Sequence, residues 1–201
     1  MSEAPLPARH RPLVLGSTSP YRRELLSRLH LTFQTAAPEV DETERPGESP
    51  LELARRLALA KARSVAVQFP EAVVIGSDQV ADLAGEALGK PGTHERAVAQ
   101  LRRMSGRSVI FHTAVAVVCA ASGFEQLEVA PVRVAFRNLS DAEIESYLLA
   151  ERPYDCAGSA RSEGLGIALL DAIDSDDPTA LVGLPLIRTC RMIGAAGVKV
   201  L

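Results

Sequence analysis

Asp78 and Lys90 are the residues whose types and positions best suit chemistry on phosphates. Asp78 follows the short apolar run 72–75, which lies between Pro70 and Gly76 and predicts a buried strand with Asp78 at its carboxyl end. Ligands of open α/β sheets bind outside such strand ends, so an acid there is placed to meet a substrate, with a lysine just beyond it. An aspartate that merely begins a turn is the alternative.

The beginning of the chain predicts an anion site. The apolar run 13–15 leads through a loop containing Ser17 into a helix for which Ser19 suits the N-cap. A helix start presents unpaired backbone N–H groups, and Arg22 and Arg23 add positive charge. Basic residues there oppose the helix dipole unless an anion meets them. We therefore favour a polyphosphate site over a merely solvated basic turn.

An acidic segment, residues 38–44, supplies further carboxylates, among them Glu42. It lies between a second predicted strand and a helix that begins with a capping box, Ser49 to Glu52. Lys61 on that helix is a candidate phosphate contact. Acidic runs and single helix lysines are more often simply solvated, so this segment alone leaves both interpretations open.

Six short motifs occur in order at residues 15–26, 38–42, 61–62, 76–80, 89–91 and 104–106, and further segments follow at 156–159, 162–166 and 181–186. Together they resemble the Maf family of nucleotide pyrophosphatases over almost the whole chain. Six motifs in the right order argue strongly against chance. The resemblance implies an elongated, twisted, mixed α/β sheet flanked by helices, with two lobes around a cleft, as in Maf and ITPase-like proteins.

The resemblance also implies a reaction: hydrolysis of a nucleoside triphosphate between its α and β phosphates, giving the monophosphate and pyrophosphate. Asp78 then either deprotonates the attacking water or holds a divalent ion that acidifies it, and the sequence leaves both roles open. Glu42 is the best second carboxylate for a magnesium or manganese ion. Charge on the triphosphate would be neutralised by Lys61, Lys90 and Arg22. Ser17 would orient it.

Within the family, the chain resembles the branch described as acting on 7-methyl-GTP. The branch acting on dTTP and UTP usually has Arg, Thr and Gln at the positions of Tyr21, Gln79 and Glu163. A 7-methylated guanine is a cationic ring, which gains from an aromatic face and a nearby carboxylate. Its N1–H and amino group are donors that Glu163 can accept and the Gln79 amide can complement.

Two rival functions remain. One keeps the enzyme but changes the substrate to dTTP, UTP or other canonical or modified triphosphates. The other is a nucleotide-binding regulator of cell division without turnover, since the family is also named for inhibiting septum formation when overproduced.

Composition bounds the remaining possibilities. A chain of 201 residues with 47% hydrophobic content predicts one domain, residues 13–201, preceded by a flexible segment, residues 1–12. A formal charge of -3 argues against a nucleic-acid binder. The sequence lacks an apolar stretch of the roughly 20 residues that cross a membrane, and we expect a cytoplasmic protein with reduced cysteines. The resemblance suggests a homodimer.

The predicted elements alternate between strands and helices and include one long antiparallel hairpin, which indicates a mixed α/β sheet. The later elements are a helix over 93–104, the hairpin 108–137 turning at 121–123, a helix from 140 to about 150, a strand over 167–170 and a last helix over 184–193.

Overall fold

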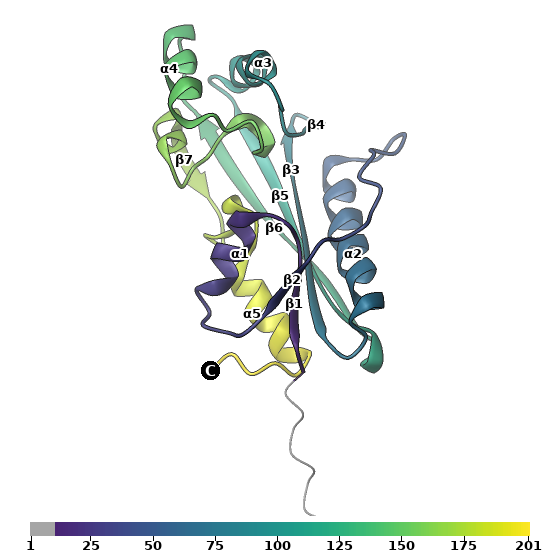
Figure 1. Ribbon diagram of the computed structural model, residues 1–201. Coiled ribbons are helices and arrows are strands. Elements are labelled where there is room, and N and C mark those ends of the chain that lie inside the picture. Colours follow the sequence, from purple (N-terminus) through teal and green to yellow (C-terminus); the bar gives the residue numbers. More distant parts are fainter. Residues whose placement is uncertain (1–10) are drawn as a thin grey trace, which may run out of the picture.

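The computed structural model describes residues 11–201, and within them seven strands form one mixed sheet flanked by five α-helices (Figure 1). The predicted mixed α/β class is confirmed. The segment predicted to be flexible lies, apart from its last two residues, outside the described part of the chain. The strands are β1 (Leu13–Gly16), β2 (Gln34–Ala36), β3 (Val73–Leu83), β4 (Glu86–Leu88), β5 (Ser108–Cys119), β6 (Phe124–Phe136) and β7 (Leu170–Asp174).

The sheet has the strand order β2-β1-β3-β5-β6-β7, and β4 pairs with β3. β1 pairs in parallel with β2 and β3, whereas the remaining pairs are antiparallel. The long hairpin predicted over 108–137 is confirmed as β5 and β6, joined by a 3-10 turn that ends at Gly123 with φ 65°. Glycine adopts this left-handed conformation without steric cost.

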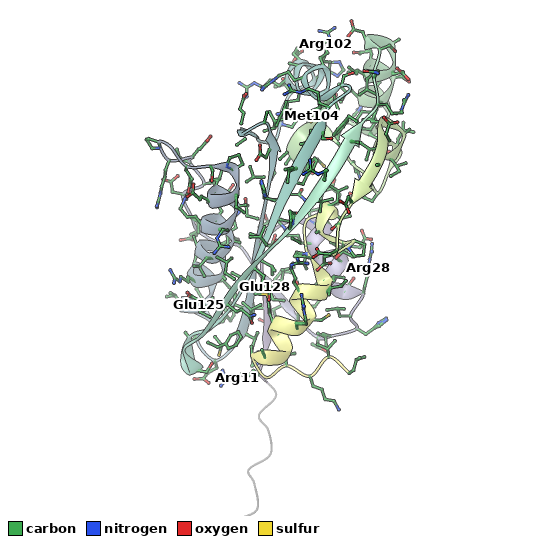
Figure 2. The ribbon with its side chains drawn as sticks, turned by 180° about the vertical axis from the view of Figure 1, so that it is seen from behind. Arg11, Arg28, Arg102, Met104, Glu125 and Glu128 are labelled. Atoms are coloured by element: carbon green, nitrogen blue, oxygen red, sulfur yellow. The ribbon has the colours of Figure 1, made fainter. Side chains whose placement is uncertain are left out.

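Helices cover the two faces of the sheet at one end of the molecule and gather at its other end (Figure 1). At the end that contains β1 and β2, α2 packs on one face of the sheet, while α1 and α5 pack on the other face. Figure 2 shows Arg102 and Met104 of α3 far from Arg11 and Glu125 at the opposite end, as expected for an elongated, two-lobed molecule. The helices are α1 (Pro20–Ser27), α2 (Pro50–Gln68), α3 (His94–Met104), α4 (Asp141–Glu151) and α5 (Leu186–Ala195).

Three predicted helix starts, after Ser19, Ser49 and Ser140, are confirmed. The Ser19 side chain accepts a hydrogen bond from the backbone N–H of Arg22, and Pro20 occupies the first helical turn. The predicted capping box from Ser49 to Glu52 forms, and a second one forms at the start of α4. The polar side chains at these positions satisfy N–H groups that have no partner inside the helix.

Three predicted boundaries are wrong. β3 does not end near residue 75 but continues to Leu83, so Asp78 lies in the middle of a strand. It continues because β5 pairs with it along residues 74–82. The strand predicted over 167–170 begins only at Leu170, since residues 165–169 form a 3-10 helix, and the last helix begins at Leu186.

Gly76 allows α2 to pack directly against β3. A Cβ atom at this position would lie 2.4 Å from the Ala58 carbonyl oxygen and 2.5 Å from the Ala62 backbone nitrogen. Both obstacles are helix backbone, which cannot rotate away as a side chain can. The close approach also sets the distance from α2 to the residues that follow Gly76 on the strand.

We predict that Gly76→Ala lowers the free energy of unfolding by about 2 kcal/mol or more, because it overpacks a rigid contact. Urea denaturation measures this. Gly194→Ala is the matched control, since a Cβ there meets nothing within 4 Å on an exposed helical position. It should leave stability unchanged or raise it by up to about 1 kcal/mol. Equal losses in the two variants would contradict the packing argument.

Candidate active site

The site is built around a gap in the strand pairing of β3. β1 pairs with β3 up to Gly76, and β4 pairs with it only from Ala81 onward. Residues 77–80 therefore have a strand partner on the β5 side alone. Side chains alternate between the two faces of a strand, so Asp78 faces α2, whereas Gln79 points to the opposite face.

Lys61, Asp78 and Glu42 form a compact ionic cluster at this gap. The Lys61 Nζ atom donates to Asp78 Oδ1 at 2.6 Å and lies 2.7 Å from Glu42 Oε1. Lys61 and Asp78 are 6% and 8% exposed, so both charges are largely removed from water. The three predicted residues are thus brought together from α2, from β3 and from the loop between β2 and α2.

Glu42 is the exposed member of this cluster, with 60% of its side chain accessible. Partial burial raises the pKa of Glu42, but the hydrogen bond and charge of Lys61 outweigh it, with Lys90 and Arg22 adding to them, so the pKa lies below its usual value. Glu42 is therefore ionised at neutral pH and directed at the buried ammonium group.

Arg56 holds the acidic loop in place, a role that its sequence position did not signal. Its guanidinium donates to both Glu48 carboxylate oxygens at 2.5 and 2.7 Å and to the carbonyl oxygens of Asp41 and Thr43. The hydrogen bond from Arg56 lowers the pKa of Glu48 to about 2. These contacts fix the backbone on both sides of Glu42.

Arg22 turns into the site, as predicted, but is also bound to the protein itself. Its Nε atom donates to the Gly183 carbonyl oxygen at 2.8 Å. Burial lowers the pKa of Arg22 from its usual value, while Asp78 and Glu42 raise it. Arg23, by contrast, is exposed and lines a neighbouring hydroxyl-rich hollow together with Ser17.

Ser17 is buried and serves the loop itself. Its hydroxyl accepts a hydrogen bond from the Ser19 backbone N–H at 3.1 Å. The cavity containing Asp78 is not lined by Ser17. The predicted contact between Ser17 and the substrate therefore stays a prediction.

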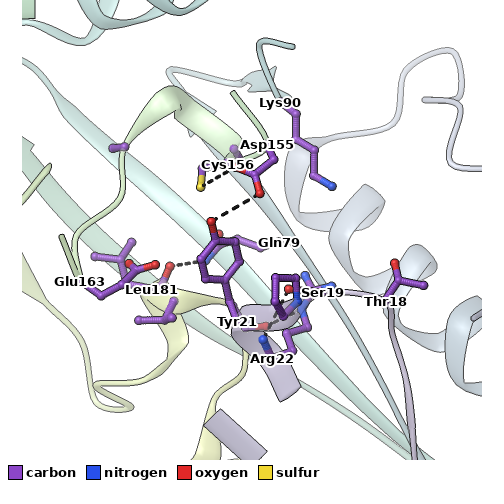
Figure 3. Close-up of a pocket in the computed structure, with 15 residues that line it drawn as sticks. Thr18, Ser19, Tyr21, Arg22, Gln79, Lys90, Asp155, Cys156, Glu163 and Leu181 are labelled. Carbon is purple, nitrogen blue, oxygen red and sulfur yellow. Dashed lines mark hydrogen bonds between the residues drawn. The ribbon is translucent and has the colours of Figure 1, made fainter. Parts of the chain in front are cut away.

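Two adjoining cavities meet at this site. The Asp78 cavity is lined by the ionic cluster and by Lys90, and it is bounded by both halves of the molecule, as the predicted cleft requires. The Tyr21 cavity is shown in Figure 3. Both cavities are lined by Arg22, Gln79, Lys90 and Ala157. A single elongated ligand can thus reach from one to the other.

The Tyr21 cavity brings together the three residues predicted to determine base specificity, Tyr21, Gln79 and Glu163 (Figure 3). The Tyr21 hydroxyl donates to Asp155 Oδ2 at 3.4 Å. Burial raises the pKa of Tyr21 to about 12, and Cys156 and Asp155 add to the rise. The phenol therefore stays protonated and remains a donor.

Gln79 corrects part of the sequence interpretation. Its Nε2 atom donates to Thr113 Oγ1 and to the carbonyl oxygens of Ala180 and Leu181, at 2.9 to 3.0 Å. Two carbonyl acceptors require the nitrogen on that side of the amide. The Nε2 hydrogens are therefore used to hold the 180–183 segment, and only Oε1 is left to meet a ligand, as an acceptor.

Two further residues at the Tyr21 cavity escaped the sequence interpretation. Arg161 places its guanidinium carbon 5.4 Å from the centre of the Tyr21 ring and its Nε 3.4 Å from Glu163 Oε1. Asp155 stands one residue before the motif 156–159, and this adjacency was the one signal that could have marked it. Both come from the long loop after α4, whose course the local sequence pattern did not predict.

Glu42 and Asp78 are the residues that could hold a divalent ion. Within residues 11–201, three or more His, Cys, Asp or Glu side chains do not converge on a common metal-sized site. Two carboxylates directed at one ammonium group are hard oxygen donors, which suits magnesium or manganese bound jointly by protein and substrate oxygens. The residues present fit such an ion, and its binding stays a prediction.

The family model for "Maf-like protein" matches residues 12–196. This chain belongs to the Maf family. The site described above therefore lies in a Maf protein, and the predicted family membership is confirmed. The six ordered motifs on which that prediction depended all fall inside the matched range.

Two curated Maf relatives cover nearly the whole chain. The 7-methyl-GTP pyrophosphatase of Polaromonas sp. (strain JS666) is 77% identical over 188 residues, which are 94% of this chain and 86% of the relative. The 7-methyl-GTP pyrophosphatase of Albidiferax ferrireducens is 73% identical over 191 residues, 95% of this chain and 96% of the relative.

Among solved structures, a HAM1 protein from Coxiella burnetii overlaps with a TM-score of 0.43 and 16% identity, over 64% of this chain and 74% of that chain. The helices within residues 11–201 include none with the length and apolar character needed to cross a membrane.

We predict that Lys61→Met lowers the free energy of unfolding by about 3 kcal/mol, because it leaves the buried Asp78 carboxylate without its cation. Asp78→Asn should cost less than half as much, since Lys61 keeps its ion pair with Glu42. Urea denaturation at neutral pH compares the two variants. A larger loss for Asp78→Asn would contradict this account of the cluster.

The depressed pKa of Glu48 predicts an acid-dependent loss of stability. Its value of about 2 lies below the usual 4.5, so the stabilisation is complete above the unfolded-state pKa and is lost as the pH falls through the folded-state value. The free energy of unfolding should fall between about pH 5 and pH 2, and Glu48→Gln should make this fall shallower. Parallel pH profiles for the two proteins would refute the prediction.

Proposed function

We propose that this Maf protein hydrolyses a nucleoside triphosphate between its α and β phosphates, releasing pyrophosphate, and that 7-methyl-GTP is its preferred substrate. The observation that carries the proposal is the junction of two cavities, one lined by paired carboxylates and cations and the other by an aromatic ring and acids. The names of the relatives, at 73 to 77% identity, support the same substrate.

The Asp78 cavity receives the triphosphate in this proposal. Lys61 donates to Asp78 Oδ1 and thereby fixes the orientation of the carboxylate. Asp78 Oδ2 makes no hydrogen bond with another residue in the range 11–201, so it is the atom we assign to accept the proton of the attacking water. Lys90 and Arg22, which line both cavities, neutralise charge on the phosphates as it develops.

A magnesium or manganese ion is part of this proposal, with Glu42 as a protein ligand and Asp78 as the second ligand in the alternative in which it holds the ion instead of accepting the proton. When bound, it would supply charge neutralisation at the phosphate oxygens and acidify a bound water. Lys61 lies between the same two carboxylates, so together these side chains keep two negative charges close and oriented. The contacts of Arg56 with the loop around Glu42 support that orientation.

The Tyr21 cavity receives the base. The Tyr21 ring offers a face to a cationic methylated guanine. Glu163, and Oε1 of Gln79, accept hydrogen bonds from the donor groups on the guanine edge. This assignment keeps Gln79 as a specificity residue, but as an acceptor with its nitrogen bound to the protein.

The reaction is tested by pyrophosphate release across a panel of nucleoside triphosphates, including 7-methyl-GTP, GTP, dTTP and UTP, with magnesium or manganese. We expect 7-methyl-GTP to give the highest kcat/KM and Asp78→Asn to lower it by at least about a hundredfold, because the general base is lost. Release that favours dTTP or UTP would shift the assignment to the pyrimidine branch. Absence of release from all of them would favour a nucleotide-binding regulator.

Base specificity is tested by exchanging Tyr21→Arg, Gln79→Thr and Glu163→Gln together. We expect kcat/KM for 7-methyl-GTP to fall relative to UTP by about ten- to a hundredfold, since each pocket contact is worth about 1 to 3 kcal/mol. Circular dichroism and a melting curve serve as the folding control. An unchanged ratio in a folded variant would remove these residues from base recognition.

A homodimer and a cytoplasmic location also belong to the proposal. The family resemblance suggests the dimer, and the three free cysteines within residues 11–201 suit a reducing compartment. Light scattering on the purified full chain measures the oligomeric state, for which we expect twice the monomer mass of 21.4 kDa.

A further inference from the structure

Two acids line the Tyr21 cavity, Asp155 and Glu163, and they differ in whether a cation lies within ion-pair distance. We propose that Asp155 is the residue through which this cavity selects a positively charged base over its neutral counterpart. This inference rests on the proposed function and assigns a specificity role to a residue that the base-specificity motif does not include.

Asp155 combines contact with the cavity and an uncompensated charge. Its carboxylate lines the Tyr21 cavity and accepts the hydrogen bond of the Tyr21 hydroxyl through Oδ2 at 3.4 Å (Figure 3). Among residues 11–201, Asp155 has no ion-pair partner. Lys90 lines the same cavity but lies beyond ion-pair distance of this carboxylate.

Glu163, the acid predicted from the sequence, has a cationic neighbour. Its Oε1 lies 3.4 Å from Arg161 Nε, so a guanidinium already offsets its charge. The same guanidinium lies 3.5 Å from Glu151 and over the Tyr21 ring. Arg161 itself does not line the cavity, so it acts on Tyr21 and Glu163 from outside.

Arg161 also changes what the Tyr21 ring can contribute. A cation over an aromatic ring already draws on the negative electrostatic potential of its face, which leaves less attraction for a second cation. Discrimination by charge then depends more on an unpaired carboxylate at the ring edge than on stacking alone. Asp155 lies there, with Oδ2 3.4 Å from the phenol oxygen.

The charge of Asp155 should act on a methylated guanine and hardly at all on guanine itself. N7-methylation adds a positive charge without changing the donors on the Watson–Crick edge. The hydrogen bonds that Glu163 and Gln79 Oε1 accept from that edge therefore favour both bases alike, whereas a nearby negative charge favours the cation alone. Because Asp155 is exposed, salt should screen the effect.

The test compares kcat/KM for 7-methyl-GTP and for GTP at slightly acidic pH, where the methylated ring keeps its N1 proton and positive charge. We expect Asp155→Asn to lower the ratio of the two values by about tenfold, mainly through KM for 7-methyl-GTP. Asp155→Glu should restore most of the ratio. In the wild type the ratio should fall with rising ionic strength, and in Asp155→Asn it should not.

Two controls separate charge from structure. Tyr21→Phe removes the hydroxyl that Asp155 binds but keeps the carboxylate, so the ratio should change much less than in Asp155→Asn. Asp171→Asn changes the net charge equally at an exposed position on β7 and should leave the ratio unaltered. A ratio unchanged in Asp155→Asn, or lowered equally by Tyr21→Phe, would overturn the proposal.

Binding of the products gives a readout that does not depend on turnover. Calorimetric titration with 7-methyl-GMP and GMP should show a Kd ratio that shifts by the same factor in Asp155→Asn. If pyrophosphate is not released but this shift occurs, the proposed reaction fails while the role of Asp155 stands. If pyrophosphate is released and the Kd ratio does not move, the reaction stands and the role of Asp155 fails.

Discussion

The site depends on one feature of the sheet: β3 continues four residues past its pairing with β1 before β4 covers it again. Strand alternation within that window sends Asp78 toward α2 and Gln79 toward the 180–183 segment. One short stretch of backbone thereby serves two cavities on opposite faces. A ligand that crosses the gap meets both, which is how a single strand can bring together the groups proposed for catalysis and for base recognition.

Burial of a charged cluster is costly, and the surroundings offset that cost. Lys61 and Asp78 are almost inaccessible, so each needs the other, and Glu42 shares the ammonium from the exposed side. Gly76 lets α2 approach closely enough for Lys61 to reach the strand. Arg56 holds the loop that carries Glu42. The orientation of the Asp78 carboxylate is thus maintained by packing as well as by charge.

The wall of the Tyr21 cavity is held by hydrogen bonds on the face of the sheet opposite to α2. The Gly183 carbonyl oxygen accepts hydrogen bonds from Arg22 and from Ser77, and the Gln79 amide holds the two carbonyl groups before Val182. A substitution of any of these side chains would therefore also shift the 180–183 segment, which forms part of the wall of the Tyr21 cavity. Arg22 lines both cavities, so the two are linked through this side chain.

The sequence by itself determined the hairpin, the capped helices, the mixed sheet and the family, because these follow from alternation, capping residues and ordered motifs that are local in the chain. It also named the members of the ionic cluster. Only the tertiary structure decided that β3 runs on past residue 75, because strand length depends on a partner, β5, that comes much later in the chain. The same holds for the pairing of Arg161 with Glu163, the freedom of Asp155 from any cation within residues 11–201, and the bound nitrogen of Gln79. These are contacts between segments distant in sequence, and local residue patterns carry no information about which partner a side chain will meet.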